Sequence, residues 1–113
     1  MFSSKPLIEA MNLGRDRIVV SSLVSSCTSV IELAEFLDHL CKNGYLGMYN
    51  WAKDVHEEAK IKLIELLKDS SYHKGVGLQI LLIVSAQEST WLDTVIEVLD
   101  RNKKQNGNYQ LLQ

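Results

Sequence analysis

The sequence contains very little that would interrupt a helix. Pro6 is the only proline in the 113 residues, and the six glycines are scattered along the chain. Because proline and glycine end helices and build the turns between strands, their scarcity favours helices over a strand-and-turn architecture. Apolar residues make up 46% of the chain, which suffices for a domain of this length to bury one core. We therefore predict a single all-α domain.

The clearest helix follows Ser29. Ser29 and Glu32 form a capping-box pattern, and Lys42-Asn43-Gly44 provides a stop signal. Between them, apolar residues recur at three- and four-residue spacing and define one buried face: Val30, Leu33, Ala34, Leu37, Leu40 and Cys41. The preceding segment, Pro6 to about Ser25, is predicted to be a helix bent or broken near Gly14.

Four further helices are predicted after Gly44. A short one covers Asn50 to His56, and a longer one covers Glu57 to Asp69. After a loop from Ser70 to Gly75, the segment 77–87 is apolar nearly all round, which predicts a central helix packed on several sides. A buried strand is the competing interpretation of residues 80–84, but the chain offers no partner strands.

The final helix begins at Thr90, and the chain becomes polar from Arg101 onward. This pattern divides the chain into an N-terminal extension (1–12), a helical bundle (13–101) and a polar tail or linker (102–113). The bundle would hold six helices around one core, for which we predict Leu37, Leu40, Leu63, Leu67, Leu81, Leu82 and Val95.

Charge and targeting signals limit the classes of function. The net charge is −2 and the pI is about 5.9, so no broad basic field is available to attract nucleic acid. The N-terminus has no pattern of a signal peptide, and the apolar run at 78–84 is too short to span a bilayer. A cytoplasmic protein with both thiols free fits these features best.

No group of residues carries a catalytic pattern. His39 and Cys41 are two positions apart, so on a helix they point to different faces and cannot form a nucleophile–base pair. Cys41 is predicted to be a buried, inert thiol, and Cys27 shares no metal-ligand spacing with it. The three histidines, His39, His56 and His73, also lack metal spacing. We predict no enzyme activity, no metal and no cofactor.

The distribution of charge allows a sharper hypothesis. It contains a basic group, Arg15, Arg17, Lys60 and Lys62, and an acidic group, Glu32, Glu35, Asp38 and Asp54. One interpretation is an ordinary solvated surface. The other is a pair of opposite patches through which copies of a domain dock head to tail. Trp51, placed among polar residues, is a candidate for a partly exposed partner contact.

Three stretches resemble the caspase recruitment domain (CARD) of the death-fold superfamily. Arg15 to Val20 is similar to the charged start of that family's kinked first helix. Phe36 to Leu46 resembles its second helix, which closes on a polar-Gly-aromatic-Leu turn. Ala59 to Lys68, with the helices after it, resembles its fourth to sixth helices. The likeness covers about residues 13–100. The region 47–56 lacks the family's usual run of acidic residues, so Asp54 is the only candidate for the acidic contact that the family makes through its third helix.

The resemblance implies a six-helix antiparallel Greek-key bundle with neither catalysis nor cofactor. It also implies homotypic recruitment or oligomerisation with other CARD-containing proteins, or with itself, in apoptotic, inflammatory or antiviral signalling. An alternative is a small helical regulator that binds nucleic acid. That alternative rests on Lys103-Lys104 near the C-terminus and on Lys60 and Lys62.

Overall fold

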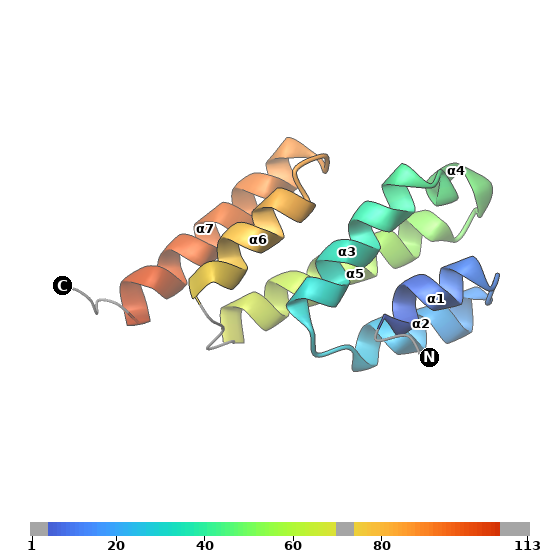
Figure 1. Ribbon diagram of the computed structural model, residues 1–113, viewed down its shortest axis with the longest axis horizontal. Coiled ribbons are helices and arrows are strands. Elements are labelled where there is room, and N and C mark those ends of the chain that lie inside the picture. The colour runs from blue at the N-terminus through green and yellow to red at the C-terminus, as the bar shows by residue number, and fades with distance from the viewer. Residues whose placement is uncertain (1–4, 70–73, 107–113) are drawn as a thin grey trace.

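The computed structural model describes residues 5–69 and 74–106 (Figure 1). The described residues form α-helices and turns without any strand, which confirms the all-α prediction. The helices are α1 (Pro6–Asn12), α2 (Arg17–Ser26), α3 (Val30–Lys42), α4 (Tyr45–Met48), α5 (Ala52–Asp69), α6 (Lys74–Ile83) and α7 (Ser89–Asn106). None of them is both long enough and apolar enough to cross a membrane.

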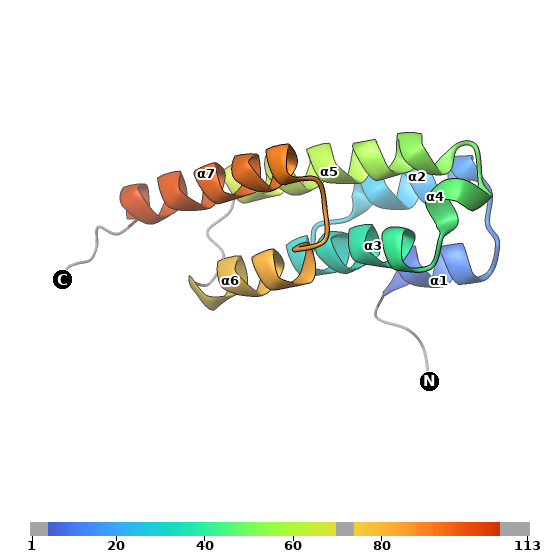
Figure 2. The same ribbon diagram turned by 90° about the horizontal axis from the view of Figure 1, so that it is seen from above.

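The helices are arranged as three antiparallel hairpins that stand side by side: α1–α2, α3–α5 and α6–α7 (Figure 1). Figure 2 shows two layers, with α1, α3 and α6 in one and α2, α5 and α7 in the other. Within the layers α3 packs against both α1 and α6, and α5 packs against both α2 and α7. Each hairpin therefore packs mainly on its neighbour in sequence, and the Greek-key arrangement implied by the resemblance is not confirmed.

The N-terminal hairpin belongs to the core. Residues 1–12 were predicted to be an extension, but α1 buries Leu7, Ala10 and Met11. Their spacing of three and four residues makes one apolar stripe, and Pro6 suits the first helical turn. The predicted break near Gly14 is confirmed, because Gly14 has a φ of 70° and the chain reverses there. The two halves then pack against each other as α1 and α2.

The central hairpin follows the sequence pattern closely. Ser29 Oγ accepts a hydrogen bond from the Glu32 amide at 3.1 Å, as the capping box predicts. The prediction of two helices at 50–56 and 57–69 was wrong, since α5 is continuous from Ala52 to Asp69. No breaker separates His56 from Glu57, and one buried stripe crosses that junction: Ala52, Val55, Ala59, Leu63 and Leu67.

The C-terminal hairpin departs most from expectation. The helix predicted at 77–87 to be packed on several sides is α6, which buries Ile80 and leaves Leu78 and Leu82 exposed. The reason is its position at the end of the stack, where α3 and α7 are its main neighbours among the described helices. Of the predicted core, Leu81 is half-buried and Leu82 is exposed, whereas these five are buried: Leu37, Leu40, Leu63, Leu67 and Val95.

Two predicted boundaries also change. Residues 102–106, predicted as part of a polar tail, continue α7, while 107–113 lie outside the described residues. The predicted loop at 70–75 ends earlier than expected because α6 begins at Lys74, and its residues 70–73 are likewise outside the described part.

Candidate interaction surface

The predicted basic residues do not gather into one free patch. Arg17, at the start of α2, reaches across to α5 and lies 3.4 Å from Asp54 Oδ2 and 3.6 Å from Glu58 Oε2. The Lys60 side chain is only 13% exposed and pairs with Glu57 at 3.1 Å. Lys62 is half-buried, and Arg15 is exposed in the turn between α1 and α2. Arg17 is thus joined to Asp54, a member of the predicted acidic group.

All four predicted acidic residues have partners inside the chain. Glu32 accepts a hydrogen bond from the Leu7 amide at 3.1 Å and so caps the first turn of α1. Glu35 pairs with Lys5 at 3.2 Å, across the α1–α3 contact, and Asp38 pairs with Lys42 at 3.0 Å within α3. Glu32 and Glu35 therefore help to hold α1 against α3, and the role of the acidic residues in binding a partner stays a prediction.

The Arg17–Asp54 ion pair allows a direct test of whether the two predicted groups of charge meet inside the chain. Both side chains are half exposed or more, so we expect a coupling energy of only about 0.2–1 kcal/mol that falls with added salt. Urea unfolding of Arg17→Ala, Asp54→Ala and the double variant measures it as a double-mutant cycle. Lys53→Ala, an exposed neighbour on α5, is the matched control in place of Asp54→Ala. A coupling no larger than that control would mean that the pair does not form.

A largely buried polar cluster joins the α6–α7 turn to both long helices of the central hairpin. Gln87, in the turn after α6, is only 8% exposed. Its Nε2 donates to the Leu37 carbonyl at 3.4 Å and to Cys41 Sγ at 3.3 Å, and both of these residues lie on α3. Its Oε1 lies 2.9 Å from His56 Nε2 on α5. One side chain thus fixes the α6–α7 turn to both helices of the neighbouring hairpin.

This cluster brings the Cys41 thiol near the His56 imidazole, but the imidazole nitrogen that faces the thiol is already engaged with Gln87. Cys41 Sγ and His56 Nε2 are 3.8 Å apart. Because an amide oxygen only accepts hydrogen bonds, His56 Nε2 carries the proton that it donates to Gln87 Oε1. The same nitrogen cannot then take a proton from Cys41. Burial lowers the pKa of His56, which favours this neutral donor form, although the Gln87 hydrogen bond opposes the shift.

The cluster escaped sequence analysis because its members are 15 to 46 positions apart. The only signal was a lone glutamine at the end of an apolar segment. Cys41 was predicted to be buried, but it is only half-buried. The buried thiol is that of Cys27. Burial raises the pKa of Cys27, and the nearby Glu32 carboxylate acts in the same direction.

Four aromatic rings form a ladder where α3, α4 and α5 meet. The ring centroids of His39 and Tyr45 are 5.5 Å apart, those of Tyr45 and Tyr49 6.0 Å, and those of Tyr49 and Trp51 4.9 Å. Asn12 Oδ1 accepts hydrogen bonds from the Tyr45 hydroxyl at 3.1 Å and from His39 Nε2 at 3.0 Å. Trp51 is therefore half-buried in a stack that closes this end of the bundle, and its role as a partner contact stays a prediction.

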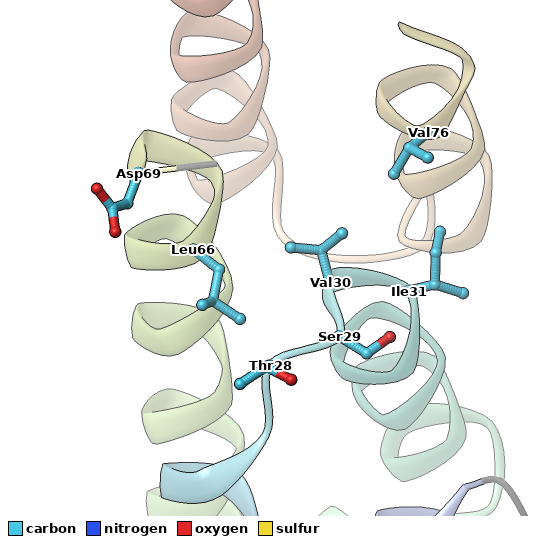
Figure 3. A pocket seen from close by; sticks show the side chains of 7 residues that line it. All are labelled: Thr28, Ser29, Val30, Ile31, Leu66, Asp69 and Val76. Carbon is cyan, nitrogen blue, oxygen red and sulfur yellow. The ribbon is translucent and has the colours of Figure 1, made fainter. Parts of the chain in front are cut away.

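A shallow cleft of about 330 Å³ separates the start of α3 and the end of α5 from α6. Figure 3 shows that Val30, Ile31, Leu66 and Val76 line it, while Asp69 points away from their centre. Thr28 and Ser29 complete the lining. The cleft is mainly apolar and brings no pair of reactive side chains together. In the described part of the chain, no group of three or more histidine, cysteine or acidic side chains could hold a metal ion.

Large exposed apolar side chains occur on all three hairpins, and two of the three most exposed lie on α6. Leu78 is 66% exposed and Leu82 is 69% exposed. They are one helical turn apart and lie on the side of α6 opposite the buried Ile80 and Val84. Ile96 on α7 is 50% exposed. We call these three residues, Leu78, Leu82 and Ile96, the α6–α7 outer face.

No known protein family, no curated protein and no solved structure matches this chain.

Proposed function

We propose that this chain is a protein-interaction module that binds helical partner proteins through the α6–α7 outer face. The observation that supports this most directly is the pair Leu78 and Leu82, both about two-thirds exposed on consecutive turns of one helix. Grouped apolar side chains that remain in water are typical of surfaces that another protein covers.

The energetics favour a helical partner. Covering a leucine side chain that is exposed to this extent gains on the order of 1–2 kcal/mol, and the gain from several neighbours adds up. Residues at positions i and i+4 present a ridge along the helix axis. Such a ridge fits the groove of another helix or helical hairpin, as α6 itself packs against α3 and α7.

The resemblance to CARDs suggests which class of partner and which kind of signalling this module would serve. We propose homotypic recruitment by CARD-like partners in apoptotic, inflammatory or antiviral signalling, and a cytoplasmic location in which Cys27 and Cys41 stay unpaired, as they are here. This form rests on the likeness of the three sequence stretches. The Cys41–His56 pair lends no support to a catalytic alternative, because the proton on His56 Nε2 is donated to Gln87.

The nucleic-acid alternative gains no support from the described residues. Lys60 is largely buried and paired with Glu57, and Lys62 is half-buried. The side chains of Lys103 and Lys104 lie outside those that the structure describes.

Binding to a panel of purified CARDs, with unrelated helical domains for comparison, tests the proposal. We expect biolayer interferometry to detect at least one CARD with a Kd in the micromolar range, and Leu78→Glu/Leu82→Glu to weaken that binding about tenfold or more. Gln79→Glu adds one negative charge at an exposed position of α6 that flanks the ridge, but it removes no apolar side chain and should change little.

Two results would contradict the proposal. If the double variant and wild type bind equally well, the α6–α7 outer face is not the binding surface. If only unrelated helical domains bind, the CARD-like form is wrong while the interaction function remains.

A further inference from the structure

The stack of hairpins has two uncovered ends among the described residues. The central hairpin α3–α5 has a neighbour on each side, whereas α1–α2 and α6–α7 each pack against the central hairpin alone (Figure 2). Stacks of helical units normally carry polar residues on their terminal outer faces, because an apolar end would remain in water. Both ends of this stack depart from that rule.

The C-terminal end carries the α6–α7 outer face, Leu78, Leu82 and Ile96. On α7, Asp93 lies one turn before Ile96 and is exposed. It forms no ion pair with any described residue. This end therefore carries an apolar ridge on α6 and, on α7, an acidic side chain one turn from Ile96.

The N-terminal end has the complementary features. Ile18 on α2 is 79% exposed and lies opposite the buried Val20 and Val24. Leu13, in the turn before α2, is 63% exposed. Arg15 lies in the same turn, is exposed, and forms no ion pair within the described part of the chain. We call Leu13, Arg15 and Ile18 the α1–α2 outer face.

From these two faces we infer that copies of this chain stack end to end, with the α1–α2 outer face of one copy on the α6–α7 outer face of the next. The contact places apolar side chains against apolar side chains and brings an unpaired arginine toward an unpaired aspartate. It also continues the packing of hairpin on hairpin that the chain already uses internally. This inference rests on the proposed interaction function and adds that the partner is a second copy.

The geometry predicts an open-ended assembly. The two faces are different surfaces, so the contact is heterologous, and each added copy leaves one face of each kind uncovered. A symmetric contact between two α6–α7 outer faces would cover Leu78 and Leu82 but would leave Ile18 in water. The number of apolar side chains is small on each side, so each contact is weak and the assembly depends on concentration.

Sedimentation velocity on the full chain tests this directly. For the wild type we expect the weight-average mass to at least double between about 10 µM and about 1 mM, which corresponds to a weak contact. Leu78→Glu/Leu82→Glu blocks one end, and Ile18→Glu blocks the other. Each variant alone should remain monomeric, while Gln79→Glu should assemble as the wild type does. Far-UV circular dichroism and melting of each variant establish that it is folded.

A mixture of the two blocked variants distinguishes the end-to-end contact from a symmetric contact between identical faces. Each variant keeps one intact face, so an equimolar mixture should form dimers and nothing larger. A mixture that stays monomeric while the wild type assembles would overturn the inference, and so would Ile18→Glu assembling as well as the wild type. A wild type that is monomeric throughout would also overturn it. Binding of CARDs in the interferometry experiment would then still support the interaction function with a different partner.

Discussion

Replacing Leu63 by alanine is expected to lower the free energy of unfolding by about 2–5 kcal/mol. Leu63 is fully buried on α5, the helix that packs against α2, α3, α4 and α7. Removing its side chain leaves a cavity at the centre of the stack, which the surrounding helices can fill only in part. Urea or thermal unfolding followed by circular dichroism measures the loss.

Leu82→Ala is the matched control, because it makes the same chemical change at a residue that is 69% exposed. We expect it to change stability by no more than about 0.5 kcal/mol. Similar losses for Leu63→Ala and Leu82→Ala would show that α6 is covered on its outer side. The assignment of the α6–α7 outer face would then be wrong.

Replacing Gln87 by leucine is expected to cost about 1–3 kcal/mol of stability at neutral pH. Leucine keeps much of the volume but leaves the Leu37 carbonyl and the His56 N–H without this partner. Because Gln87 fixes the turn between α6 and α7, hydrogen exchange should increase mainly in that hairpin. Gln79→Leu, an exposed glutamine on α6, is the control and should cost little.

The same cluster predicts a pH dependence of stability. Burial lowers the pKa of His56 below its ordinary value, so the unfolded chain takes up a proton at a higher pH than the folded chain. Stability is then complete above the ordinary histidine pKa of about 6.5 and falls as the pH drops toward the lower folded value. Burial also lowers the pKa of His39, partly opposed by Asp38, and this shift acts in the same direction.

Gln87→Leu should increase the contribution of His56 to the pH dependence of stability. The hydrogen bond that His56 donates to Gln87 raises the pKa of His56, so its removal should lower that pKa further and steepen the loss of stability in acid. Titration of the His56 ring signals by NMR measures the change, and the His39 signals serve as the internal reference. An unchanged or higher His56 pKa in the variant would show that the His56–Gln87 hydrogen bond is not formed in solution.

The sequence determined the local structure well where short-range signals act alone. The capping box at Ser29, the stop at Gly44 and the break at Gly14 all depend on residues within a few positions of one another. The same local signals explain why Leu37, Leu40, Leu63, Leu67 and Val95 were predicted to be buried and are buried. The all-α class follows from them directly.

Tertiary structure alone decided which faces and charges remain free. The apolar segment 77–87 predicts a helix packed on several sides, but the position of α6 at the end of the stack leaves Leu78 and Leu82 in water. Arg17 and Asp54 look like members of two patches until α2 packs on α5 and joins them. Cys41, His56 and Gln87 meet only because α3, α5 and the α6–α7 turn converge. Helical periodicity tells which residues share a side of one helix, whereas the neighbours of that side depend on contacts between segments far apart in the chain.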